Sequence, residues 1–183
     1  MEYHQTRAKF KTEKEMLSEL AALCSRAEHC TFELREKMGR YGMDEETQTR
    51  IISRLVKERF VDDERFARCF AAEKVKFNRW GRRKVEQALR MKRIPAEVIA
   101  SILGEIEDET YMEVLRTLLK SKAKSIKASN AYERNRKLVQ FAMGRGYDYE
   151  LIRNCVKEMG GEADLECEDD IGYESGIGRE VEE

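Results

Sequence analysis

The sequence is poor in the residues that build most catalytic and metal-binding sites. It contains two histidines, His4 and His29, which lie far apart, and a single proline. Two distant histidines cannot supply a metal site alone, and no nucleophile stands beside a general base in a recognisable pattern. We therefore predict no catalytic site, no metal and no cofactor, and the sequence favours a binding protein over an enzyme.

Disulfide frameworks and membrane spans are also missing. The cysteines are odd in number and lack metal-ligand spacing: Cys24, Cys30, Cys69, Cys155 and Cys167. Three of them, Cys24, Cys69 and Cys155, fall at helical apolar positions, so we interpret them as small core residues. There is no apolar run long enough to cross a membrane and no signal peptide pattern. We expect a cytoplasmic protein without membrane contact.

No run of β-branched residues with period two is long enough to predict a strand. What the chain has instead is a helical apolar pattern that occurs three times. Met43, Ile94 and Tyr147 are separated by 51 and 53 residues. Nine and five residues before each lie Leu34 and Met38, Val85 and Leu89, and Leu138 and Ala142. This spacing predicts an all-α protein, a tandem array of three three-helix repeats that is elongated and curved.

The predicted repeats span residues 14–61, 62–106 and 107–160. The remainder, 161–183, has no apolar period and is expected to be a disordered acidic tail. Four helix starts carry residues suited to capping: Thr31, Asp44, Asp62 or Asp63, and Asp148. Pro95 is expected at the first position of another helix, where its missing N–H costs nothing.

The net charge of −1 hides an asymmetry between this tail and the rest of the chain. The tail holds ten acidic residues and one basic residue, whereas the other residues sum to a charge of +8. A basic body with an acidic tail is typical of nucleic-acid or filament binders that screen their own binding face. The alternative, that the tail only improves solubility, has equal weight.

Two stretches, 65–93 and 116–137, are strongly basic. The acidic residues inside them are too few to form many i,i+4 ion pairs, which favours a binding surface over a merely solvated helix face. The 82–84 stretch is expected to be exposed, and Trp80 is expected to pack rather than stack on a base. The candidate partner-binding or DNA-binding residues are Arg68, Lys74, Lys76, Arg79, Arg82, Arg83, Lys84, Arg90, Lys120, Lys122, Lys124 and Lys127.

The segment Val61-Asp62-Asp63-Glu64-Arg65-Phe66-Ala67 resembles the Asp-Asp-x-Arg-Phe-Ala signature of the RecX family of recombination regulators. Trp80-Gly81, followed by Val85, Leu89 and Arg93-Ile94, is similar to the central unit of that family. The signature residues Asp62, Asp63, Arg65 and Phe66 are expected to be structural, with an aspartate capping a helix and Phe66 anchoring it. Thr47 and Gln48 depart from the apolar pairs found at the matching positions of the other repeats.

The resemblance implies a regulator of homologous recombination and the DNA-damage response. Such proteins bind the RecA recombinase filament on single-stranded DNA and restrain it, by lying in its groove, blocking extension or promoting disassembly. Duplex DNA is a further candidate partner, and a monomer is expected.

The alternative is a helix-turn-helix DNA-binding regulator without a recombinase partner. The acidic starts of the predicted third helices, such as Asp44-Glu45-Glu46, count against that alternative. A scaffold without nucleic-acid contact is a third hypothesis.

Overall fold

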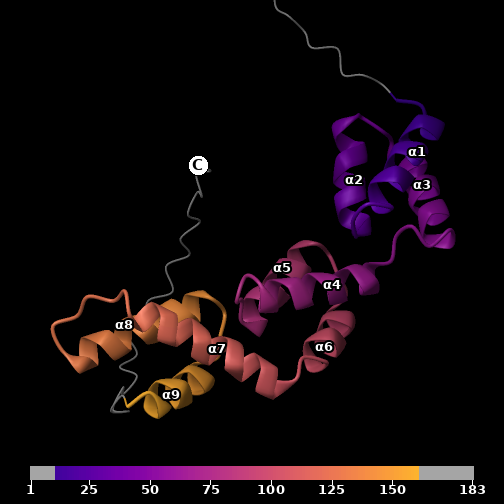
Figure 1. Ribbon diagram of the computed structural model, residues 1–183. Coiled ribbons are helices and arrows are strands. Elements are labelled where there is room, and N and C mark those ends of the chain that lie inside the picture. The colour runs from indigo at the N-terminus through magenta and orange to yellow at the C-terminus, as the bar shows by residue number, and fades with distance from the viewer. Residues whose placement is uncertain (1–10, 161–183) are drawn as a thin grey trace, which may run out of the picture.

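The computed structural model describes residues 11–160, and within that range the chain forms nine α-helices and no strand (Figure 1). The all-α prediction is confirmed, whereas the predicted acidic tail lies outside the described residues. The helices form three consecutive groups of three, in a bent row. They are α1 Glu13–Cys24, α2 Thr31–Arg40, α3 Glu45–Lys57, α4 Asp63–Lys76, α5 Arg82–Met91, α6 Ala96–Gly104, α7 Asp108–Ala123, α8 Ala131–Gly144 and α9 Tyr149–Glu158.

The threefold sequence pattern marks one recurring helix end. The second helix of each group, α2, α5 or α8, is followed by a residue in the left-handed region: Gly42 at φ 70°, Arg93 at φ 59° and Gly146 at φ 86°. The next amide turns back and donates to the carbonyl five residues earlier, from Met43 to Met38 (3.3 Å), Ile94 to Leu89 (3.2 Å) and Tyr147 to Ala142 (3.2 Å). This is the Schellman geometry, which pairs the apolar residue after a helix with one in its last turn.

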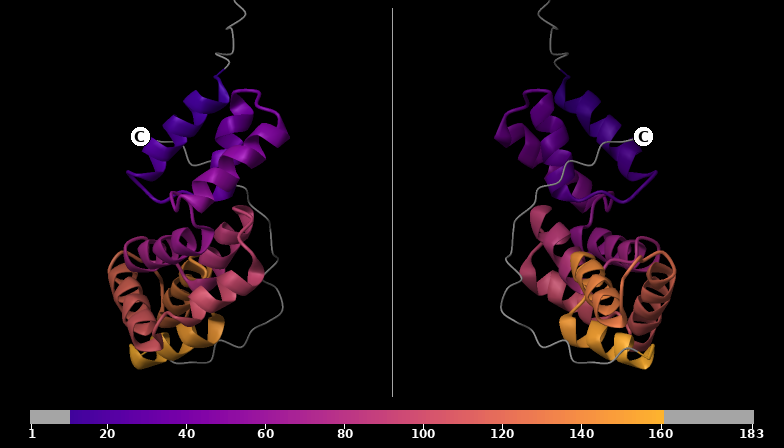
Figure 2. Two further views of the ribbon diagram at one scale, coloured as in Figure 1. Left: turned by 90° about the vertical axis from the view of Figure 1, so that its right-hand side faces the viewer. Right: turned by 90° about the vertical axis from the view of Figure 1, so that its left-hand side faces the viewer.

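The three groups are not joined in the same way. Helices α1–α3 enclose a core of their own, with Leu20, Met38 and Leu55 fully buried. Helices α4–α9 share one continuous core that runs from Phe66 to Val156. Figure 2 shows the α1–α3 body set apart from the α4–α9 body. The second and third groups are therefore fused, and the first is attached to them.

The fused joint depends on close backbone contact between two loops. The amide of Gly81 donates to the Arg145 carbonyl (2.7 Å), and the amide of Arg83 donates to the Gly146 carbonyl (3.1 Å). A Cβ at Gly81 would overlap the backbone of Gly146, so only glycine fits there without a shift. The rings of Tyr111 and Tyr147 stack in the adjoining core with centroids 5.0 Å apart.

The joint between α1–α3 and α4–α9 is largely polar. The Asp63 carboxylate accepts hydrogen bonds from the amide and the hydroxyl of Thr31, both at 2.7 Å. A second link is the ion pair between Arg65 and Glu28 (2.8 Å), and a third joins Lys92 to Glu33. We call these three links the α2 clamp, because they hold the start of α2 and the segment before it. Cys30 and Phe32 add an apolar contact with the α4–α9 core.

Several local predictions need correction. Cys69 is exposed, whereas Cys30, which was not predicted to be a core residue, is buried and is the N-cap of α2. Thr31 is therefore the first residue of α2, and its amide is capped from another helix by Asp63. Pro95 occupies the N-cap of α6 rather than its first position.

Two predicted caps have different outcomes. The side chain of Asp44 accepts from the amide of Thr47 (2.8 Å) at the start of α3, as predicted. Asp148 is the N-cap residue of α9 but makes no capping bond with its side chain. Its carboxylate instead pairs with Arg83 at 2.8 Å. The predicted position is therefore confirmed and the capping bond is not, because the sequence does not show that α5 brings Arg83 to this carboxylate.

Candidate functional site

The signature residues lie where the second helix group meets the first. The Asp62 side chain accepts from the amides of Glu64 (3.0 Å) and Arg65 (2.9 Å) at the start of α4. Asp63 and Arg65 belong to the α2 clamp, and the Phe66 ring is buried in the α4–α9 core. The motif thus combines a helix cap with contacts between helix groups.

Five of the twelve candidate cations already have an acidic partner within the described residues. Arg68 pairs with Glu64 and Glu105, both at 2.9 Å, and Arg90 pairs with Glu86 at 2.6 Å. The interpretation that opposite charges are too scarce was therefore wrong for these residues, because Glu64 and Glu86 lie one helical turn away and Glu105 comes from the end of α6. The other three are Lys74, Arg82 and Arg83.

Arg82 and Arg83 hold the fused joint. The Arg82 guanidinium donates to the Ile106 carbonyl (2.7 Å) and to Asp108 (2.8 Å), and it lies 4.5 Å from the centroid of the Tyr111 ring. Arg82 and Lys84 are half-buried, so the expectation of an exposed 82–84 stretch is confirmed at Arg83 alone and is wrong at the other two residues. The hydroxyl of Tyr111 accepts a hydrogen bond from the Arg82 amide (2.9 Å). Burial raises the pKa of this phenol.

The other seven candidates have no ion pair with an acid in the part of the chain that the structure describes. They are Lys76, Arg79, Lys84, Lys120, Lys122, Lys124 and Lys127. Each is exposed or half-buried. A cation that is exposed and unpaired remains available for a phosphate or for an acidic protein surface. These seven are therefore stronger binding candidates than the five paired residues.

Aromatic rings connect several unpaired cations and the paired Lys74 into one surface. Lys84 lies over the Trp80 ring (4.6 Å to the centroid), and so does Lys74 (5.8 Å). The Trp80 ring also packs edge-on against Phe70 at 6.4 Å, which agrees with its predicted packing role. Beyond the loop, both Lys122 (4.9 Å) and Arg145 (5.4 Å) lie over the ring of Phe141.

Arg145 completes this surface, and the sequence analysis missed it. Its guanidinium donates to the Asn78 carbonyl (3.2 Å), so it links the loop after α8 to the loop between α4 and α5. The available signal was positional, since Arg145 and Lys92 both lie two residues before a repeat anchor. We call the combined surface the cation–aromatic strip: Lys74, Lys76, Phe77, Arg79, Trp80, Lys84, Lys122, Phe141 and Arg145.

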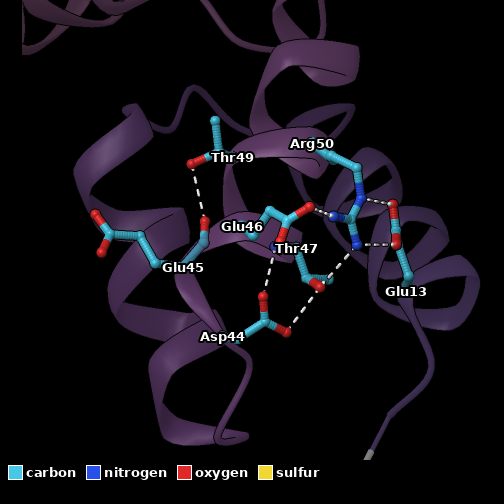
Figure 3. Close-up of polar contacts among 7 residues, drawn as sticks. All are labelled: Glu13, Asp44, Glu45, Glu46, Thr47, Thr49 and Arg50. Carbon is cyan, nitrogen blue, oxygen red and sulfur yellow. Dashed lines mark hydrogen bonds and ion pairs between the residues drawn. The ribbon is translucent and has the colours of Figure 1, made fainter.

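The starts of the third helices have the opposite character. Figure 3 shows the start of α3, where Arg50 is held by Glu13 (2.9 Å) and Glu46 (3.0 Å). Asp44 lies beside them and caps the helix. Since carboxylates repel phosphates, this end of α3 is unsuited to entering a DNA groove.

Residues 11–160 bring no three histidine, cysteine, aspartate or glutamate side chains together as a metal site would need. None of the helices in this range has the length and apolar character required to cross a membrane.

Comparison with known proteins identifies the family. Residues 62–103 match the second three-helix domain of RecX, and residues 109–156 match its third three-helix domain. A regulatory protein RecX from Chlorobaculum tepidum is 32% identical over 143 residues, which cover 78% of this chain and 86% of that protein. The chain belongs to the RecX family. Both this relative and others that the chain matches carry the name regulatory protein RecX.

Other RecX proteins extend the comparison. One from Clostridium botulinum is 31% identical over 128 residues, covering 69% of this chain but only 59% of the relative's length. The crystal structure of RecX from Lactobacillus salivarius has a TM-score of 0.72 at 17% identity, with 81% of this chain and 96% of that chain covered. This likeness shows that the helical fold is shared.

Proposed function

We propose that this protein binds the RecA recombinase filament on single-stranded DNA and restrains it, by occupying the filament groove or blocking its extension. The observation that carries the proposal is the match of α4–α9 to two successive RecX domains. The proposal includes a monomer that works in the cytoplasm, in recombination and the DNA-damage response. The proposed repeat bounds are 14–61, 62–106 and 107–160.

The cation–aromatic strip and the neighbouring lysines supply the contact surface in this proposal. Lys120, Lys124 and Lys127 lie at the end of α7 and in the loop after it, and Lys122 joins them to the strip. Their positive charge suits the phosphates of the DNA and acidic patches of a protein filament. Duplex DNA would meet the same charges, so we expect it to compete.

The test is co-sedimentation of the protein with RecA, with and without single-stranded DNA. We expect the protein to sediment with the complete filament. Reversal of Lys120, Lys122, Lys124 and Lys127 to glutamate should reduce this binding at least tenfold. The matched control reverses four exposed cations of the α1–α3 body that have no ion pair with any residue in 11–160: Lys14, Arg26, Arg40 and Lys57. Equal loss in both variants would show a general charge effect, and no loss in the first would remove these lysines from the contact.

The helix-turn-helix alternative has less support. A recognition helix needs a start that can approach base edges. The start of α3 is acidic, and Asp148 at the start of α9 is paired with Arg83. Binding to duplex DNA that is tight, sequence-specific and independent of RecA would favour that alternative instead.

A further inference from the structure

The α4–α5 loop carries an aromatic ring that the fold does not use. Phe77 is 74% exposed, and it follows directly after the last residue of α4. The other ring of this loop, Trp80, is half-buried and packs against the core, whereas the ring of Phe77 does not. A single exposed apolar side chain is ordinary on a protein surface and means little alone.

The surroundings distinguish Phe77 from the other exposed apolar side chains. The sequence from Lys74 to Val85 contains six basic residues and no acidic one. Lys76 lies 5.6 Å from the centroid of the Phe77 ring. The nearest acid in the chain is Glu73, which is paired with Lys74 (2.9 Å). Arg82 and Arg83 are also paired with acids, but Lys76, Arg79 and Lys84 have no ion pair among the described residues. An exposed ring beside such unpaired cations can offer a flat face to a base while the cations hold the flanking phosphates.

The loop that carries this ring is fixed at several points. The Trp80 amide donates to the Lys74 carbonyl (3.0 Å), and Arg79 adopts the left-handed region at φ 54°. The carbonyl of Asn78 is held by Arg145, and Gly81 is held by the loop after α8. Because these contacts restrain the backbone on both sides of Asn78, the ring is presented without a large ordering cost on binding.

We propose that Phe77 is a stacking platform for a base of single-stranded nucleic acid, with Lys76, Arg79 and Arg145 holding the adjacent phosphates. The proposal rests on the strip being the DNA-binding surface in the proposed function, and it does not require contact with the recombinase. It predicts that the protein recognises bases as well as backbone charge. Stacking on an aromatic ring tolerates any base, so no sequence preference is expected.

The test compares two strands of equal length, an oligothymidylate and a fully abasic strand with the same phosphates. The parent protein should bind the oligothymidylate about tenfold more tightly. Phe77→Ala should remove that preference and leave binding to the abasic strand unchanged. Phe77→Trp should retain the preference. Met91→Ala is the matched control, since Met91 is 71% exposed at the opposite end of α5, and it should behave as the parent.

Two results would overturn the proposal. One is a parent protein that binds both strands equally, and the other is Phe77→Ala with the full preference retained. Circular dichroism of each variant checks the fold. Filament co-sedimentation separates this proposal from the proposed function. A protein that prefers bases but does not bind the filament would keep the stacking role and refute the function. A Phe77→Ala variant that loses only filament binding would make Phe77 a protein contact instead.

Discussion

The two joints of this molecule connect similar three-helix groups by opposite means. Between α4–α6 and α7–α9 the core is continuous, and a glycine allows two loops to touch. Between α1–α3 and α4–α9 the connection is the α2 clamp of three polar links, together with a small apolar contact. Apolar burial is strong and fixes one geometry, whereas partly exposed ion pairs contribute little each and can exchange with water.

The difference indicates which relative positions the molecule can change. We expect α4–α9 to move as one body, which would hold the cation–aromatic strip rigid because its residues come from both fused groups. We expect α1–α3 to change its angle relative to that body when the clamp opens. Under the proposed function, opening and closing of α1–α3 would let the protein adjust to the filament without disturbing the strip.

The largest loss of stability should come from truncating a buried leucine in either core. Leu89→Ala and Leu55→Ala each remove a fully buried side chain and should each cost about 2–5 kcal/mol of unfolding free energy. The two variants should destabilise different regions, because Leu89 lies in the α4–α9 core and Leu55 in the α1–α3 core. Chemical denaturation measures the cost, and segment-resolved hydrogen exchange shows where it falls. Leu89→Ala should raise exchange in α7–α9 as well as in α4–α6. If the exchange of Leu89→Ala rose in α4–α6 alone, the result would contradict a shared core.

A second prediction concerns the glycine contact of the fused joint. Gly81→Ala should lower the unfolding free energy by about 1–3 kcal/mol, because the new Cβ overlaps the Gly146 backbone. The control is Gly104→Ala at the end of α6, where an added Cβ meets nothing within 4 Å. Thermal denaturation of the two variants measures the difference. A Gly81→Ala protein as stable as the control would show that the loops can separate without cost.

A third prediction separates the two signature aspartates. Asp62→Ala removes the cap of α4 and should cost about 0.5–2 kcal/mol of unfolding free energy. Asp63→Ala removes the bond to Thr31, so α1–α3 should be released and the radius of gyration should increase. Small-angle scattering measures this increase, and Asp62→Ala serves as its control. An unchanged radius for Asp63→Ala would mean that the remaining links suffice to hold the clamp closed.

The smallest effect should be a pH dependence of the clamp. Burial acts to raise the pKa of Glu33, but the ion pairs with Lys92 and His29 outweigh it and leave the pKa below its ordinary 4.5. The stabilisation from ionised Glu33 is therefore complete above about pH 4.5 and is lost as the pH falls through the lower folded-state value. Scattering at decreasing pH should show the clamp loosening, and Glu33→Gln should loosen it at neutral pH. If neither the lower pH nor Glu33→Gln changed the radius of gyration, the Glu33–Lys92 pair would not help to hold the clamp closed.

Local features of this fold could be predicted from the sequence, and contacts between helix groups could not. The anchors Met43, Ile94 and Tyr147 predicted the repeat, because a Schellman end imposes fixed spacing along one helix. Whether a charged side chain is free depends on what another helix brings beside it. Arg83 was predicted to be an exposed binding residue, and although it is exposed it is paired with Asp148, which comes from the next helix group. Arg145 was missed for the same reason, since Asn78 reaches it only through the fold.

The most direct test of the two-body account is native-state hydrogen exchange of the unmodified protein across increasing denaturant. The slowest amides of α4–α6 and α7–α9 should converge on one unfolding free energy, while those of α1–α3 converge on a different one. Separate values for α4–α6 and α7–α9 would contradict the account. A single value for all three groups would do so as well.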